Sequence, residues 1–284
     1  MEYQKVNDKF YDFGGCQYKP LNIISKLKSN NILINSFTDT KYEKMFNKLT
    51  LQLKNNFGVD RTCWGIKNVN NNLEWELYFY SYPNQFKTLK SIINPFFNLP
   101  DFKNNIPRYM MWSFDINESK KQNINVYFSN KSINKNNSDL FFYTGSSWKY
   151  DGNDYEYDNC YYFWKNSIEN IEYIKDNITS SPFCQTNDIG KILISEFLEY
   201  YKKEKTDFGI VTTNKKYCDS IYYMALNIDM LILFLNKFNY PQNQIDFLEK
   251  NKDELNHLLY DVSINYKMVN GNIKILKSGY YGQI

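Results

Sequence analysis

The alternation within residues 61–82 constrains the fold of this chain more than any other feature. The stretch reads RTCWGIKNVNNNLEWELYFYSY, in which two alternating segments flank an asparagine-rich loop. Because side chains along a strand point to alternate faces, the pattern predicts a β-hairpin. One face is apolar and carries Trp64, Ile66, Trp75, Leu77 and Phe79. The other mixes charges with phenols, as the wall of a polar cavity would, and carries Arg61, Cys63, Lys67, Glu74, Glu76, Tyr78, Tyr80 and Tyr82.

The same pattern recurs four more times. Further hairpins are predicted at residues 108–129, 140–164, 208–227 and 259–281, and the last of them turns at Asn270-Gly271-Asn272. Apolar residues at helical spacing predict helices at residues 37–57, 86–99, 167–177, 190–203, 228–238 and 242–259, with Pro95 interrupting the second. No composition break marks a domain boundary, so we expect a single domain over residues 1–284.

Five hairpins separated by helices predict an α+β fold with about ten antiparallel strands. Two arrangements satisfy this order: an open sheet with helices on one face, and a closed barrel with helices outside. Ten strands are near the upper limit for a strongly twisted open sheet, and closure removes the exposed edges. We therefore expect a closed ten-stranded antiparallel barrel whose lumen is wide enough to hold a ligand.

Charge and the absence of targeting signals narrow the function classes. A formal net charge of +3 over 284 residues argues against nucleic acid as the main partner. No apolar run reaches the length of a secretory signal or a membrane span. The five cysteines are widely spaced, which argues against a zinc or disulfide framework and favours a cytoplasmic location. The single histidine, His257, argues against Ser-His-Asp catalysis and histidine metal sites.

The alternation of hairpins and helices at this length resembles the aromatic prenyltransferases of the ABBA, or PT-barrel, class. The small members that prenylate cyclic peptides in cyanobacteria are the closest in size. The resemblance is architectural and spans most of the chain. Its local elements are the hairpin at residues 64–82, Phe114-Asp115-Ile116, Ile221-Tyr222-Tyr223 and Asn272-Ile273-Lys274.

This resemblance implies a transferase of secondary metabolism that binds an allylic diphosphate in the barrel lumen. Lysines and arginines on alternating strand positions would hold the diphosphate, and tyrosines would shield the allyl cation. The prenyl group would pass to an aromatic or peptide acceptor. Such chemistry needs fixed cations on the leaving group, whose charge grows in the transition state. It also needs aromatic faces that attract the carbocation and exclude water.

The sequence of this tyrosine-rich chain supplies candidates for each of these roles. The inward tyrosines are predicted to be Tyr78, Tyr80, Tyr109, Tyr127, Tyr162, Tyr222 and Tyr280. The predicted inward cations are Arg61, Lys67, Lys267 and Lys274, with Lys149 as a further candidate. The resembled family places basic residues on the second strands of its early hairpins, whereas this chain has Glu76 and Asn125 there. Mg²⁺ is therefore a candidate cofactor that would assist these few cations.

Glu74, Glu76 and Asp115 form a carboxylate cluster on the same wall. They would take a proton from the acceptor, bind a cationic substrate group, or pair with Arg61 and Lys67 across the hairpin. Two functions remain open. One is prenyl transfer from an allylic diphosphate to an acceptor inside the barrel. The other is a barrel that binds a small molecule or peptide, or catalyses a different reaction, without recognising diphosphate.

Overall fold

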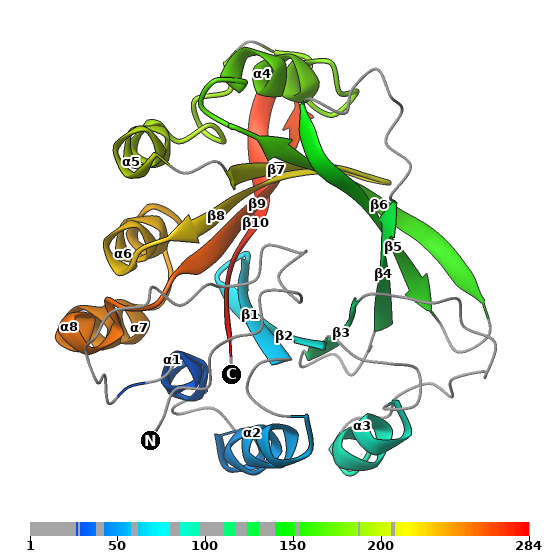
Figure 1. Ribbon diagram of the computed structural model, residues 1–284, viewed down its shortest axis with the longest axis vertical. Coiled ribbons are helices and arrows are strands. Elements are labelled where there is room, and N and C mark those ends of the chain that lie inside the picture. Colours follow the sequence, from blue (N-terminus) through cyan, green and yellow to red (C-terminus); the bar gives the residue numbers. More distant parts are fainter. Residues whose placement is uncertain are drawn as a thin grey trace.

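The strands form a closed antiparallel barrel, which confirms the predicted architecture. The computed structural model describes residue 27 and residues 29–37, 43–57, 62–79, 86–96, 111–116, 124–130, 140–150, 154–186, 188–205 and 208–283. Each strand pairs with its neighbour in sequence, and the last strand pairs with the first (Figure 1). The strands are β1 (Thr62–Val69), β2 (Asn72–Phe79), β3 (Met111–Ile116), β4 (Ile124–Asn130), β5 (Phe141–Tyr150), β6 (Tyr155–Lys165), β7 (Phe208–Lys215), β8 (Asp219–Leu226), β9 (Tyr260–Val269) and β10 (Asn272–Gln283).

The described helices lie outside the barrel, as predicted (Figure 1). They are α1 (Asn30–Ser36), α2 (Glu43–Phe57), α3 (Phe86–Ile93), α4 (Ile171–Thr179), α5 (Ser195–Glu204), α6 (Ile228–Lys237), α7 (Gln242–Lys250) and α8 (Lys252–Leu255). Helix α3 ends before Pro95, where the ring would remove a helical hydrogen bond. Several predicted helix boundaries were wrong: α4 and α5, for example, begin at Ile171 and Ser195 and not at residues 167 and 190. Helix α1 was not foreseen as a separate element, and the helix expected at residues 242–259 is divided into α7 and α8.

Two of the hairpin turns show why the chain reverses where it does. Asn70 and Asn71, between β1 and β2, have φ of 51° and 67°. Asn270 and Gly271, between β9 and β10, have φ of 51° and 76°. Positive φ at both central residues is the signature of the tight turn that matches the twist of antiparallel strands, and asparagine and glycine tolerate it best. The predicted turn at Asn270-Gly271 is thereby confirmed.

The outer face of the barrel forms the main hydrophobic core with the helices. Trp75 on β2 illustrates this packing: its ring lies 4.7 Å from that of Phe37 and 6.0 Å from that of Phe46. Its indole Nε1 donates a hydrogen bond to Ser36 Oγ at 2.9 Å. The predicted apolar face is buried, since Trp64, Ile66, Trp75, Leu77 and Phe79 are at most 4% exposed.

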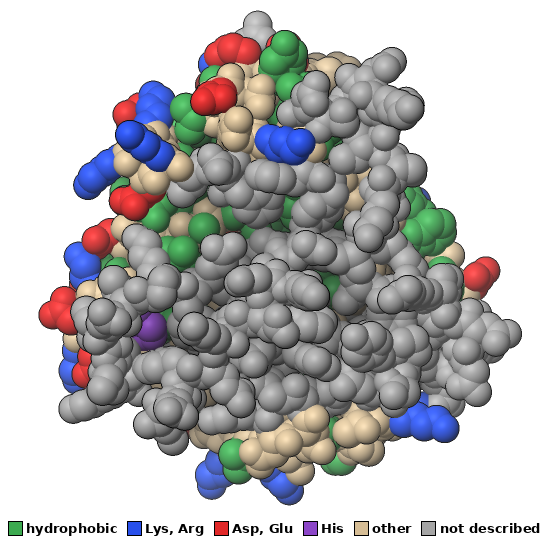
Figure 2. Space-filling model, in the orientation of Figure 1, with side chains coloured by type: hydrophobic (Ala, Val, Ile, Leu, Met, Phe, Trp, Pro, Cys, Tyr) green, Lys and Arg blue, Asp and Glu red, His purple; other side chains and the backbone are tan. Residues whose placement is uncertain are grey.

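The helices in turn cover the barrel with a polar exterior. Acidic and basic side chains are interspersed along the edge of the molecule formed by α5 to α8 (Figure 2). Cys63, Cys160, Cys184 and Cys218 are free thiols. No helix in the part of the chain that the structure describes is long and apolar enough to cross a membrane.

Truncating a side chain between helix and barrel should destabilise the fold. Leu231 on α6 is fully buried, so Leu231→Ala should lower the free energy of unfolding by about 2–5 kcal/mol, through lost apolar burial and the cavity left behind. Leu51 on α2 is 58% exposed, and Leu51→Ala should change the free energy of unfolding by less than about 0.5 kcal/mol. Urea unfolding of both variants measures the difference. Equal losses would contradict the described packing.

Candidate functional site

Strand alternation that buries one face against helices turns the other face into the lumen. There, each even-numbered strand contributes one tyrosine to a layer that we call the tyrosine ring. Neighbouring ring centroids are 6.2, 6.1, 6.2, 6.2 and 5.8 Å apart around the closed circuit. The members in order are Tyr78, Tyr127, Tyr161, Tyr222 and Tyr281. The lumen is therefore encircled at one level by five phenols.

The layer next to the tyrosine ring, called the belt here, is mostly small and polar. Each even-numbered strand contributes the residue two positions before its ring tyrosine. Each odd-numbered strand contributes the residue that pairs with that one across the hairpin. The five pairs are Gly65 with Glu76, Ser113 with Asn125, Ser147 with Asn159, Thr213 with Ser220, and Ser263 with Gly279. One pattern thus recurs in all five hairpins and gives the lumen an approximate five-fold arrangement.

The phenol oxygens are anchored to the belt. Tyr127 Oη lies 3.2 Å from Ser113 Oγ, and Tyr281 Oη lies 2.9 Å from Ser263 Oγ. Tyr78 donates its hydroxyl hydrogen bond to Glu76. Burial raises the pKa of every ring phenol, and that of Tyr161 to about 12, because the charged phenolate would lose its hydration. The ring is therefore uncharged at neutral pH.

Several belt acceptors are buried without a described hydrogen-bond partner. They include Asn125 Oδ1, Asn159 Oδ1 and Thr213 Oγ1, on residues at most 8% exposed. The amide nitrogens of both asparagines are already used, since each donates to a serine hydroxyl. Buried polar atoms in proteins are nearly always satisfied by protein, water or ligand. The belt is therefore equipped to receive hydrogen bonds from a molecule in the lumen.

Beyond the belt lies a charged collar, formed by Lys67, Lys149, Lys215, Lys277, Glu74, Asp115 and Asp158. Lys67 pairs with Glu76 of the belt, and its Nζ lies 3.9 Å from Asp115 Oδ1. Lys149 Nζ lies 3.5 Å from Asp158 Oδ1. Within the described ranges, Lys215 and Lys277 have no carboxylate at ion-pair distance. Two collar lysines are thus neutralised and two are not.

The lysines of the collar repel one another and are partly removed from water. Burial lowers the pKa of Lys67, and the neighbouring charge of Lys277 lowers it further, while Asp115 opposes the change. Burial also lowers the pKa of Lys215 to about 8, again reinforced by Lys277. The Nζ of Lys215 lies 6.0 Å from the centroid of the Tyr222 ring, whose face attracts a cation. An anionic ligand would relieve this repulsion among lysines.

The opposite side of the tyrosine ring is largely apolar. Met111, Val211 and Met224 pack there against the ring tyrosines. The exception is Asp261, whose Oδ1 accepts a hydrogen bond from the backbone nitrogen of Ala225 at 2.9 Å. Burial raises the pKa of the Asp261 carboxyl well above its usual range. The lumen therefore changes from charged, through polar and phenolic, to apolar along its axis.

The structure brings together most of the predicted site residues that it describes. Strand parity and contacts place Lys67, Glu74, Glu76, Asp115, Lys149, Tyr78, Tyr127 and Tyr222 in the lumen. Lys267 and Lys274 are partners near the β9–β10 turn, and Lys274 is exposed. Arg61, Tyr80 and Tyr109 lie outside the described residues.

Two predicted orientations were wrong. Tyr280 lies on the outer face, where its hydroxyl donates to Gln244 Oε1 at 2.7 Å, and Tyr281 occupies the lumen. Tyr162 packs outward on Phe141, and Tyr161 occupies the lumen. In both cases a bulge reverses the alternation, at Asp158 in β6 and at Leu276 in β10.

The same bulge in β10 explains why Lys277 was missed. Lys215 was not among the predicted cations, and it is the last residue of β7, before the turn at residues 216–218. A signal for the ring was present in the sequence. In the second strand of each hairpin, a polar residue or glycine stands two positions before a tyrosine, as in Glu-Leu-Tyr, Asn-Val-Tyr, Asn-Cys-Tyr, Ser-Ile-Tyr and Gly-Tyr-Tyr. Aligning the hairpins on that step would have found all five ring members.

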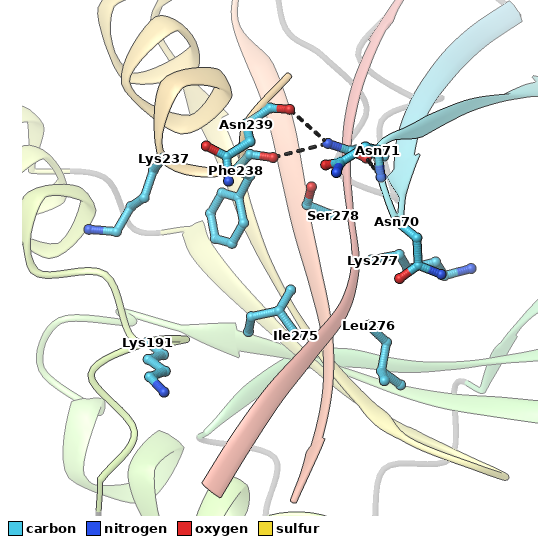
Figure 3. A pocket seen from close by; sticks show the side chains of 11 residues that line it. Asn70, Asn71, Lys191, Lys237, Phe238, Asn239, Ile275, Leu276, Lys277 and Ser278 are labelled. Atoms are coloured by element: carbon cyan, nitrogen blue, oxygen red, sulfur yellow. Dashed lines mark hydrogen bonds between the residues drawn. The ribbon is translucent and has the colours of Figure 1, made fainter. Parts of the chain in front are cut away.

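A separate pocket of about 380 Å³ lies outside the barrel, between the β1–β2 turn, the end of α6 and β10 (Figure 3). Lys191, Lys237, Lys277 and several asparagines line it. Asn68 is engaged structurally, because its Nδ2 donates to the carbonyls of Phe238 and Asn239 at 3.0 and 3.2 Å. Lys237 pairs with Glu196 at 3.4 Å. Asn68 and Lys237 of this lining are thus engaged within the protein.

Neither magnesium nor a histidine-bound metal fits the described donor set well. Magnesium binds through one or two carboxylates together with substrate phosphates. Glu76, Asp115 and Asp158 of the lumen already face lysines, and the described ranges contain no group of three or more His, Cys, Asp or Glu that could hold a metal. An iron site with two histidines and one carboxylate is beyond a chain with one histidine. The lysines are the available counter-charges.

Comparison with known proteins finds a distant relative. No family model matches the chain. The chain is similar to the JmjC domain-containing protein L887 of Acanthamoeba polyphaga mimivirus, with 26% identity over 312 residues. The match covers 94% of this chain and 49% of that protein, so the chain spans about half the length of the curated relative it matches. At this identity the likeness does not assign the chain to a family.

The absence of a side chain at Gly65 leaves room for two rings of the tyrosine ring. A Cβ added there would lie 2.7 Å from the ring of Tyr281 and 3.4 Å from that of Tyr78. Gly65→Ala should therefore displace Tyr281, reduce the near-ultraviolet circular dichroism, and lower the free energy of unfolding by about 1–3 kcal/mol. Gly190→Ala is the control, because an added Cβ meets nothing within 4 Å. Unchanged spectra in Gly65→Ala would contradict the described ring.

Proposed function

We propose that this protein is a PT-barrel-type transferase that moves a prenyl group from an allylic diphosphate to an acceptor in the lumen. The observation that carries the proposal is the tyrosine ring together with a collar in which two lysines have no carboxylate partner among the described residues. Ionisation of an allylic diphosphate needs cations for the leaving group and aromatic faces for the carbocation. The lumen provides both, separated by the belt.

The diphosphate belongs at the collar. Lys215 and Lys277 have no described carboxylate partner, so they are the primary ligands, and Lys67 and Lys149 are the secondary ones. Collar and ring are four residues apart along a strand, roughly 13.6 Å between backbones. The lysine side chain shortens this distance, since Lys215 Nζ lies 6.0 Å from the centroid of the Tyr222 ring. The prenyl chain would point inward from the collar and end among the phenols.

Bond cleavage at the allylic carbon releases diphosphate to the lysines and leaves a cation facing the tyrosine ring. The phenols stay protonated at neutral pH, so they shield the cation by their π-faces and do not trap it as phenolates. The acceptor atom then forms a bond to the allylic carbon and loses its proton to a carboxylate. Asp115 is the better placed base, because Glu76 is engaged by both Lys67 and Tyr78.

The second candidate is a lumen that binds a small molecule or peptide, or catalyses a different reaction, without recognising diphosphate. A specific observation favours it: Glu74, Glu76, Asp115 and Asp158 face the same space as the four lysines. Two of the lysines are neutralised by these carboxylates, which reduces the positive potential a diphosphate would meet. The match covers only about half of the mimivirus protein, so the name of that protein does not decide between these candidates.

Titration calorimetry with dimethylallyl diphosphate tests the choice. Lys215→Met and Lys277→Met should each weaken binding about 10- to 100-fold, because a hydrogen bond to a charged group contributes ~1.5–3 kcal/mol. Lys216→Met is the matched control, since the adjacent Lys216 is exposed and pairs with Glu156 outside the lumen. No heat of binding with the unaltered protein, with or without magnesium, would remove the transferase in favour of the second candidate.

Diphosphate binding should also depend on pH in a defined direction. Lys215 carries its charge below its pKa of about 8 and loses it above. Affinity should therefore fall as the pH rises from about 7 to about 9, by about 10-fold once the charge is lost. Lys215→Met should remove most of this decrease over the same range. A steeper or opposite pH dependence in the variant would contradict the assignment of Lys215.

A further inference from the structure

Lys215 is set apart from the other lysines of the lumen by its surroundings. It ends β7, faces the interior, and directs its Nζ over the Tyr222 ring at 6.0 Å. Lys67 and Lys149 each have a carboxylate partner, whereas Lys215 has none within the described ranges. The next residue, Lys216, points outward and pairs with Glu156. Two adjacent lysines therefore experience opposite environments.

The groups facing Lys215 favour its uncharged form. Burial and the charge of Lys277 lower its pKa to about 8, and Lys149 acts in the same direction. Cys218 and Asp158 oppose this change to a lesser degree. An amine that is half-buried beside other cations, and partly deprotonated at neutral pH, has the environment of lysines that attack carbonyl carbons.

Unpartnered polar atoms lie beside this amine. Asn159 is the cross-strand partner of Lys215, and Thr213 precedes it by two residues on the same face. Asn159 Oδ1 and Thr213 Oγ1 are buried and have no described hydrogen-bond partner. The Thr213 hydroxyl is able to donate to a carbonyl oxygen, and the Asn159 oxygen is able to accept from a hydroxyl that forms there.

We propose that Lys215 is a nucleophilic amine that forms an imine with an aldehyde or ketone bound in the lumen, an activity beyond prenyl transfer. The nitrogen bonds to the carbonyl carbon, and the carbonyl oxygen leaves as water with the two protons that the nitrogen gives up. Protonation of the imine produces a cation directly above the Tyr222 ring, which stabilises it. The same amine, when protonated, is the diphosphate ligand proposed above, so the two ligands should exclude each other.

Reductive trapping with benzaldehyde and cyanoborohydride near neutral pH tests the proposal on the unaltered full chain. Peptide mass mapping should show that Lys215 is alkylated at least about ten-fold faster than Lys216, because a larger fraction of its amine is uncharged. Lys216 serves as an internal control in the same sample. Equal or slower labelling of Lys215 would overturn the proposal.

Lys277→Met distinguishes an amine whose pKa is lowered by its neighbours from one that is only more accessible to the reagent. Removing the neighbouring charge should raise the pKa of Lys215, move the midpoint of its labelling upward in pH, and slow its labelling at neutral pH. Lys202→Met, at an exposed position of α5, should leave the profile unchanged. Faster labelling in Lys277→Met, as a simple gain of access would give, would overturn the proposal.

Inorganic diphosphate separates this inference from the proposed function. If both hold, diphosphate should protect Lys215 from trapping and leave Lys216 unaffected. Rapid labelling without protection would support the imine and contradict diphosphate binding at Lys215. Calorimetric binding of dimethylallyl diphosphate without selective labelling would support the transferase and overturn the imine.

Discussion

The pairing of β10 with β1 is the interaction on which the rest of the molecule depends, because it divides every strand into an outer and an inner face. In a sheet with open edges, either face could be exposed to water or buried. Closure instead commits the outer face to helix packing and the inner face to an enclosed space. The residues obey this division closely: Trp64 and Ile66 are buried outside, while Lys67 is buried inside. A lysine at that depth is tolerable only because Glu76 and Asp115 accompany it.

The lumen inherits its layers from repetition of one hairpin. Each odd strand places a small residue at the belt, and each even strand places a tyrosine two residues beyond it. Small side chains at one level leave room for large rings at the next, and Gly65 shows how little room remains. Since the five phenols are close to one another and to the belt hydroxyls, their positions are mutually fixed. A rigid aromatic layer of this kind can serve a carbocation or an iminium ion alike.

Sequence patterns were sufficient for the hairpins, the closed barrel and most of its inner face, because alternation is a local property of each strand. They failed where alternation is interrupted. The bulge at Leu276 makes Tyr280 the wrong choice and places Lys277 and Tyr281 on the inner face. The bulge at Asp158 likewise places Tyr161, and not Tyr162, in the lumen. A bulge depends on how two strands are paired, and nothing in one strand's own composition announces it.

The chemistry of the lumen is less symmetric than its backbone. On the side formed by β1 to β3, Lys67 meets Glu76 and Asp115, so charge is balanced before any ligand arrives. On the side formed by β6 to β10, Lys215 and Lys277 repel each other, and Asn159 and Thr213 have unpartnered atoms. Uncompensated charge and unsatisfied polar atoms cost free energy, and both occur on this part of the wall, although Asn125 Oδ1 on β4 is also without a described partner. A ligand that gains from meeting them would bind against β6 to β10, whichever of the two chemistries it undergoes there.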